Sequence, residues 1–287
     1  MVRAMLIAVL ITIGLQGNAQ TESRITRYNY FFLEAIRQQE MGNLAAAFDL
    51  LNHARDINPK APEVYYEIAG YYVAMQNSKA ARYNFEQAAK LAPDNSTYLE
   101  KLGQFYISQN NYEDALTTYE QLYTSNKTRE DVLQILYQLY GAQNNYKKMI
   151  EMIERMELLS GASEQLSLTK MQIYEQMGDK RKAQAELLRL VQKNPLELNY
   201  RVMLGNWLLQ NNKKKEAYNE YQTVLKEDPN NAAAQLSLLD YYRDTKNAKM
   251  VDELTRKLLE SKKTEKETKM ALLRQAIMDN QDDSTKD

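Results

Sequence analysis

The sequence predicts an all-α solenoid of helical hairpins, because three kinds of residue recur in one frame with a period of 34 residues. Self-similarity at a fixed period is typical of repeat proteins, in which each unit buries its apolar face only against its neighbours. One column is small or apolar, one is proline, and one is tyrosine interrupted once by Leu208. In order, they are Ala47, Ala81, Ala115, Met149, Ala183, Ala217 and Val251; Pro59, Pro93, Pro195 and Pro229; and Tyr72, Tyr106, Tyr140, Tyr174 and Tyr242.

Composition supports helices and excludes several classes of function. Hydrophobic residues make up 44% of the 287 residues, and only nine Gly and five Pro are present to interrupt helices. The 37 Lys and Arg nearly balance the 38 Asp and Glu, which leaves a net charge of −1 and no positive field for phosphate backbones or anionic lipid. Nucleic acid is therefore not an expected partner.

Residues 1–19 are typical of a secretory signal peptide. Arg3 is followed by an uncharged run from Ala4 to Leu15, and small residues stand at the −3 and −1 positions of a cut after Ala19. The run is too short to cross a hydrocarbon core of ~30 Å, so we expect no integral membrane span in the mature chain. Because the chain has no Cys, we exclude a lipid attached to cysteine, disulfides and thiol catalysis. We expect an exported protein, located in the periplasm or beyond it.

Placing the prolines at position 32 of the unit divides residues 28–265 into seven repeats without an insertion, preceded by a lead-in at 20–27. Positions 4, 7, 8 and 11 are mostly apolar or small, which is the spacing of one helix face, and positions 20, 24 and 27 form a second such stripe. Positions 15 and 16 between the stripes often carry Gly, Asn or Asp, which tolerate a left-handed turn. Each repeat is therefore predicted as helix, turn, helix, turn. The repeats run over 28–61, 62–95, 96–129, 130–163, 164–197, 198–231 and 232–265.

This pattern resembles that of the tetratricopeptide repeat family, which has a large residue at position 4, small ones at 8, 20 and 27, aromatic ones at 11 and 24, and Pro at 32. The resemblance covers residues 28–265 and implies helix-turn-helix units wound into a right-handed superhelix. Lys127, Gly161 and Lys263 stand where Pro is expected in repeats 3, 4 and 7. Repeat 4 departs furthest, since its three small positions carry bulkier side chains. These are Tyr137, Met149 and Met156.

The residues after the seventh repeat predict a capping helix over 266–278. Thr264–Glu267 has the form of a capping box, in which Thr and Glu satisfy free amides at a helix start. Met270, Leu273 and Ile277 form a stripe that would cover the open end of repeat 7. Residues 279–287 contain no apolar side chain, and we expect them to be disordered.

The sequence offers no catalytic or metal-binding constellation. His53 is the single histidine and is expected at a solvated helix position, because no second His or Cys exists to complete a metal site. No nucleophile elbow or Gly-rich phosphate loop is present. The periodic tyrosines lie at positions 11 and 24, on the core stripes, and are expected to be structural. We expect no enzyme activity, no cofactor, no metal and no small-molecule substrate.

A row of carboxamides is the main candidate site. Positions 2, 5, 9 and 12 of each first helix point away from the core, and the resemblance implies that they line a concave groove. Position 9 carries Gln104, Gln138, Gln172 and Asn206 in four consecutive repeats. A carboxamide can donate to and accept from the backbone of an extended peptide. A peptide-binding ladder and its alternative, uncharged residues on a neutral surface, both remain open.

The same face is apolar in the first two repeats. Phe32, Ile36, Tyr66 and Val73 occupy positions 5, 9, 5 and 12. Clustered exposed apolar side chains mark either a binding site or a surface that another segment covers. The lead-in at residues 20–27 is a candidate cover, and both interpretations remain open.

These observations favour a non-enzymatic protein-protein interaction scaffold of the bacterial envelope that binds an extended peptide or protein segment in its groove. The alternative is a structural subunit of an envelope assembly or secretion complex that contacts its partners through convex faces and solenoid ends. A clamp of Lys and Arg for a carboxyl terminus is not expected in the groove.

Overall fold

The computed structural model describes residues 22–284, with side chains described as far as residue 278. The predicted signal peptide at 1–19 and its cut after Ala19 lie outside these residues. All regular structure over 22–284 is helical, which confirms the prediction of an all-α helical repeat fold. The chain forms two compact units, with unit 1 ending at Leu159 and unit 2 beginning at Ser160. None of the described helices is both long and apolar enough to cross a membrane.

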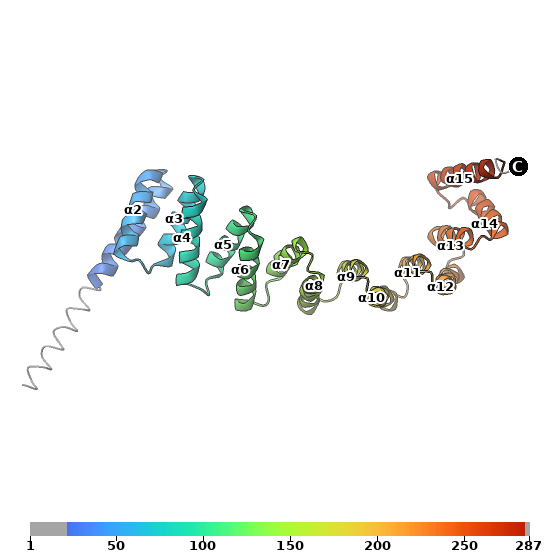
Figure 1. Ribbon diagram of the computed structural model, residues 1–287, viewed down its shortest axis with the longest axis horizontal. Coiled ribbons are helices and arrows are strands. Elements are labelled where there is room, and N and C mark those ends of the chain that lie inside the picture. Colours follow the sequence, from blue (N-terminus) through green and yellow to red (C-terminus); the bar gives the residue numbers. More distant parts are fainter. Residues whose placement is uncertain (1–21, 285–287) are drawn as a thin grey trace, which may run out of the picture. The chain divides into compact units, whose positions relative to one another are not determined.

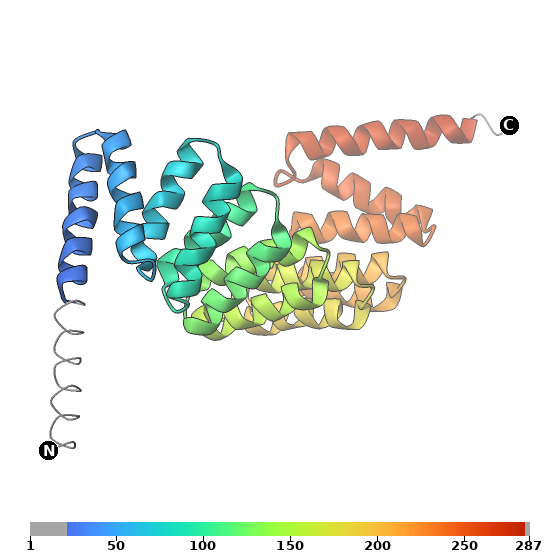
Figure 2. The same ribbon diagram turned by 60° about the vertical axis from the view of Figure 1, so that its left-hand side comes forward.

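Unit 1 consists of successive helical hairpins (Figure 1). A first helix covers residues 22–40 and runs beside α2 (Figure 2). The following helices are α2 (Leu44–Ile57), α3 (Pro62–Ala74), α4 (Ser78–Leu91), α5 (Ser96–Ser108), α6 (Tyr112–Ser125), α7 (Glu130–Ala142) and α8 (Tyr146–Ser160), the last of which ends at the unit boundary. Those of unit 2 are α9 (Glu164–Gln176), α10 (Lys180–Lys193), α11 (Leu198–Gln210), α12 (Lys214–Glu227), α13 (Ala232–Asp244), α14 (Ala248–Glu260) and α15 (Lys266–Ser284).

The helices keep the 34-residue frame. The first helices of repeats 2 to 7 begin at residues 62, 96, 130, 164, 198 and 232, where the sequence places the start of each repeat. Within a repeat, α3 packs against α4, α5 against α6, α9 against α10, α11 against α12 and α13 against α14. Within each unit, the second helices also contact the next first helix, as α4 contacts α5 and α10 contacts α11.

The two turn positions have separate roles. Position 15 has a left-handed backbone in all seven repeats, although only two of the residues there are glycine. Position 16 is the N-cap of the second helix, and in five repeats its side chain accepts a hydrogen bond from the backbone N–H three residues on. The position 15 residues are Gly42, Gln76, Asn110, Asn144, Gly178, Asn212 and Lys246.

Small residues bring the two helices of a repeat close together. The alanines at position 20 in repeats 1, 2, 3, 5 and 6 are fully buried. In repeats 3 and 6, glycine at position 8 faces the ring of a buried tyrosine at position 24. A Cβ added to Gly103 would lie 2.6 Å from Cε2 of Tyr119, and one added to Gly205 would lie 2.4 Å from Cε1 of Tyr221. These rings therefore occupy the space that a side chain at position 8 would need.

Repeat 5 contains a buried ion cluster in place of apolar contacts. Nζ of Lys170 on α9 lies 2.9 Å from Oε1 of Glu186 on α10, and the two side chains are only 5% and 12% exposed. Nε of Arg189 lies 3.2 Å from Oε2 of the same carboxylate, and Arg189 donates to the hydroxyl of Ser167 at 2.8 Å. Glu186 therefore balances two cations inside the repeat.

Helical structure extends beyond both ends of the repeat array. The lead-in is helical from residue 22 and continues into the first helix of repeat 1. At the other end, α15 continues to Ser284, so the expectation of disorder is wrong for residues 279–284. Its first residue is Lys266, which places Glu265 rather than Thr264 directly before the helix.

The predicted capping stripe of α15 is also wrong. Met270, Leu273 and Ile277 are 45%, 44% and 57% exposed, whereas Leu272 is 5% exposed. The buried Leu272 lies with Thr268 and Gln275 near Leu236 of α13. Because the apolar residues of α15 are spread around the helix, periodicity alone does not select one packing face.

Candidate functional site

The candidate carboxamides lie on the first helices, two in each unit. Gln104 on α5 and Gln138 on α7 are exposed in unit 1, and Gln172 on α9 is exposed in unit 2. Asn206 on α11 is half-buried. Each unit thus presents its own pair at equivalent positions of equivalent helices.

The four carboxamides are not equally available to a ligand. Oδ1 of Asn206 accepts a hydrogen bond from the hydroxyl of Tyr221 at 2.9 Å, so its acceptor is already used within the fold. Gln104 has only long contacts, at 3.4 Å to Glu100 and to Lys101. The equivalence of all four, which the repeat frame predicts, is wrong for Asn206.

Two tyrosines of the second helices extend toward the first-helix face from its buried side. Tyr119 and Tyr221 stand at position 24 of the second helices, and their rings pass the glycines at position 8 of the first helices. In repeat 6 the hydroxyl of Tyr221 bonds to Asn206, so the hydroxyl of a tyrosine at position 24 lies beside position 9 of the first helix. Both side chains are almost wholly buried, at 1% and 0% exposure. The sequence predicts only a small residue at position 8. The glycine found there in repeats 3 and 6 leaves room for the tyrosine ring to pass, so that its hydroxyl lies under the first helix.

The hydroxyl of Tyr119 is buried, and no hydrogen-bond partner reaches it among residues 22–278. Burial is the main cause that raises its pKa to about 12; the charges of Glu100 and Asp131 contribute to the rise and that of Arg129 opposes it. The hydroxyl therefore stays protonated at physiological pH and is available as a donor. The equivalent hydroxyl in repeat 6, that of Tyr221, donates to Asn206. Tyr119 differs from Tyr221 in having no such acceptor.

A charged cluster that the sequence reasoning missed surrounds this hydroxyl. A guanidinium nitrogen of Arg129 lies 3.0 Å from Oε2 of Glu100, and the same side chain bonds to Asp131. These bonds lower the pKa of the Asp131 carboxyl and raise that of the guanidinium. Arg129 is the last residue of repeat 3, outside positions 2, 5, 9 and 12 of the first helices. Because Arg129 directly precedes α7, it lies beside both Glu100 of α5 and Asp131 of α7.

The apolar cluster of repeats 1 and 2 is packed over part of its extent. Phe32 is half-buried and stacks on Tyr28 with ring centroids 5.9 Å apart, while Ile36 is also half-buried. Tyr66 is half-buried against Tyr98, at 5.2 Å, and Val73 is 48% exposed.

The lead-in does not cover this cluster in the part that the structure describes. Residues 22–27 continue the same helix that carries Phe32, so they cannot fold back over it. Ile25 is 51% exposed, and Arg24 donates to the carbonyl of Ile57 at 2.6 Å. The covering interpretation is therefore wrong for residues 22–27.

The described side chains include no group of His, Cys, Asp and Glu arranged to hold a metal ion. His53 is exposed and lies edge-on to the ring of Phe31, with centroids 4.3 Å apart. The donors and acceptors of the first-helix face are hydroxyl, carboxamide and carboxylate groups. Such groups can form hydrogen bonds with a peptide backbone.

Tyr119→Phe is expected to raise the free energy of unfolding of unit 1 by about 1–3 kcal/mol, because it removes a buried hydroxyl that has no partner in the fold. Tyr221→Phe should cost about 0.5–1.5 kcal/mol, since it removes the bond to Asn206. Hydrogen exchange of the α5–α6 and α11–α12 peptides measures both. Equal losses in the two repeats would show that the Tyr119 hydroxyl has a structural partner.

Comparisons with known proteins agree with this fold. A tetratricopeptide repeat family model matches residues 66–129 and 168–232, one stretch in each unit. The fold is similar to a chain in the structure of Naa15/Naa10 bound to HypK-THB, with a TM-score of 0.61 and 14% identity over 86% of this chain. This chain spans 39% of that one. A tetratricopeptide repeat protein from Parabacteroides merdae ATCC 43184 matches with a TM-score of 0.44 and 17% identity, over 87% of this chain and 98% of that one. No curated protein matches the sequence significantly.

The matched stretches carry the features that define the repeat here. Both contain a first helix with glycine at position 8, a left-handed residue at position 15 and a buried alanine at position 20. The same frame extends over the helices between and beyond them. The chain belongs to the tetratricopeptide repeat family.

Proposed function

We propose that the chain is a non-enzymatic scaffold of the bacterial envelope, in which the first-helix face of unit 1 holds an extended segment of a partner protein. Tetratricopeptide repeats generally serve as protein-protein interaction scaffolds without catalysis. The envelope location rests on the signal-peptide pattern of residues 1–19. Unit 2 would add a separate contact through Gln172.

The Tyr119 hydroxyl carries this proposal. A buried donor without a partner costs about 1–3 kcal/mol, and a ligand carbonyl at this face would remove that cost. A carbonyl that replaced Glu100 beside Arg129 would gain a guanidinium donor as well. Gln104 and Gln138 would bond to the backbone of the same segment, and Tyr66 with Val73 would contact an apolar side chain of it.

The test is photocrosslinking in a native envelope extract with the chain of residues 20–287. Benzoylphenylalanine in place of the exposed Gln134 on α7 should capture a partner. Tyr119→Phe should lower the yield of this crosslink while leaving the fold intact. Gln138→Glu should weaken binding more than tenfold, about 1.4 kcal/mol, because it removes a donor and adds a charge. Gln172→Glu, made separately, reports on unit 2.

Tyr112→Phe is the matched control, since Tyr112 is 40% exposed on the second helix α6 and its hydroxyl bonds only to Asn110. Capture that is unchanged by both Tyr119→Phe and Gln138→Glu would contradict binding at the first-helix face.

The alternative, an assembly subunit that uses outer faces and ends, is favoured by one observation. Met270, Leu273, Ile277 and Met278 form an exposed apolar stripe on α15. Crosslinks from benzoylphenylalanine at residue Leu273, with none from the same probe at residue Gln134, would support this second function.

A further inference from the structure

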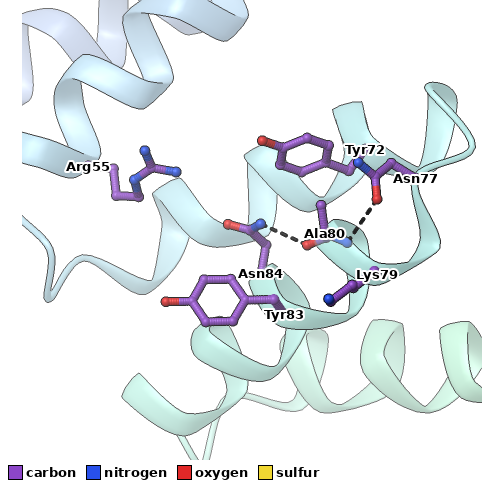
Figure 3. A pocket seen from close by; sticks show the side chains of 7 residues that line it. All are labelled: Arg55, Tyr72, Asn77, Lys79, Ala80, Tyr83 and Asn84. Carbon is purple, nitrogen blue, oxygen red and sulfur yellow. Dashed lines mark hydrogen bonds between the residues drawn. The ribbon is translucent and has the colours of Figure 1, made fainter.

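A cavity of about 430 Å³ lies between the second helices of repeats 1 and 2, and none of the candidate groove residues lines it (Figure 3). Arg55 of α2 lines it from one side. Lys79, Tyr83 and Asn84 of α4 line the other, with Tyr72 of α3 behind them.

Asn84 places an unsatisfied acceptor in this cavity. The side chain is only 3% exposed, and its Nδ2 donates to the carbonyl of Ala80 at 2.8 Å. No donor reaches its Oδ1 among residues 22–278, and this oxygen points away from the carbonyl of Ala80 in Figure 3. A ligand with an N–H group at this point would complete the hydrogen bonding of a buried polar group.

The charges around the cavity are positive. The ammonium of Lys79 has no ion pair among the described side chains, and the nearest counterion of Arg55 is the exposed Asp56 at 3.6 Å. The cavity also lies at the amino end of α4, where Asn77 caps the amide of Ala80 and the helix dipole adds positive potential. A carboxylate is therefore the favoured charged group.

Two other pairs of neighbouring repeats fill the same two positions with apolar side chains. Arg55 stands at position 28 of one repeat and Asn84 at position 23 of the next. In repeats 3 and 4 these positions hold Tyr123 and Met152, and in repeats 6 and 7 they hold Leu225 and Leu254, of which all but Leu225 are buried. Polar side chains at these two positions are thus not a requirement of the fold.

We propose that this cavity binds an acidic residue within an extended segment of a partner protein. The side-chain carboxylate would pair with Arg55 and Lys79, while the backbone N–H of the segment donates to Oδ1 of Asn84. The rings of Tyr72 and Tyr83 would contact the segment on either side. This site is independent of the groove face, so a partner can use one without the other.

The test is a titration of the 15N-labelled chain of residues 20–287, read by NMR. The probe acetyl-Gly-Glu-Gly-amide should shift the side-chain amide of Asn84 and the backbone amide of Lys79, and acetyl-Gly-Gln-Gly-amide should bind at least tenfold more weakly. Acetate, which has no N–H donor, should shift Lys79 but not the Asn84 amide. Equal affinity for the two peptides, or an unmoved Asn84 signal, would overturn the proposal.

Three variants separate the two contacts. Asn84→Thr should weaken the Glu peptide but not acetate, and it should fold, because Thr118 occupies this position in repeat 3 and bonds to the carbonyl of Asp114 at 2.8 Å. Arg55→Gln should weaken both probes. Lys90→Gln, an exposed change on the same α4, is the control and should alter neither. Tighter binding of acetyl-Gly-Gly with a free carboxyl terminus would overturn the assignment to an internal acidic residue.

Discussion

Gly205→Ala is expected to lower the free energy of unfolding of unit 2 by about 1–3 kcal/mol. The added methyl group would lie 2.4 Å from Cε1 of Tyr221, a ring that is fully buried and held by its bond to Asn206. Helix propensity alone predicts the opposite sign, since Ala is favoured over Gly by about 1 kcal/mol. Urea unfolding followed by the fluorescence of Trp207, the only Trp in the chain and buried in α11, measures the change.

A rescue and a control accompany this prediction. Tyr221→Leu combined with Gly205→Ala should recover most of the loss, because repeat 1 pairs Ala35 with Leu51 at the same two positions. Gly70→Ala should instead stabilise unit 1 by about 0.5–1 kcal/mol, since no atom lies within 4 Å of its added Cβ. A Gly205→Ala chain as stable as the parent would show that the ring of Tyr221 shifts freely, which would contradict the close contact.

Glu186→Leu is expected to destabilise unit 2 by about 3–5 kcal/mol, the largest single effect foreseen for this chain. It removes the carboxylate that lies 2.9 Å from the ammonium of Lys170 and 3.2 Å from the guanidinium of Arg189. The Lys170 side chain is only 5% exposed, so its charge would lose this ion pair without gaining water. The same Trp207 fluorescence reports the unfolding.

Replacing both ions should restore much of this stability. In the double variant, Lys170→Leu puts Leu at position 7, where repeats 3, 4, 6 and 7 also have Leu. Glu186→Leu puts an apolar side chain at position 23, where repeat 4 has Met152 and repeat 7 has Leu254. Buried ion pairs are often no more stabilising than well-packed apolar residues of similar size. A double variant no more stable than Glu186→Leu alone would contradict the view that the broken Lys170–Glu186 ion pair causes the loss.

The repeat frame and its turns were predictable because each depends on local chemistry. Seven units agree on helix periodicity, and the first helices of repeats 2 to 7 begin where the frame places them. The two turn positions were expected to share one role, yet only position 15 is left-handed, as at Gln76 and Lys246. The fold holds this geometry even where the residue disfavours it, because the hairpin must reverse within two residues.

The candidate site was predictable by residue type but not by availability. The sequence placed carboxamides at position 9, and three of the four are exposed. It did not show that Asn206 is engaged by Tyr221, or that Tyr119 has no such partner, since both hydroxyls arrive from another helix. Arg129 and the cavity beside Asn84 were missed because each joins residues of neighbouring repeats.

The sequence by itself determined the helical hairpin, its 34-residue period, the left-handed turn and the small positions that let two helices meet. These follow from periodicity, backbone freedom and side-chain volume, which are properties of residues and their near neighbours. Only the tertiary structure decided which polar groups find partners, as with Tyr119, Asn84 and the Lys170–Glu186 pair. It also decided which face of α15 packs, burying Leu272 and exposing Leu273. Such outcomes depend on atoms of residues 15 or more positions apart in sequence, whose separation to within an ångström sets both hydrogen bonding and packing.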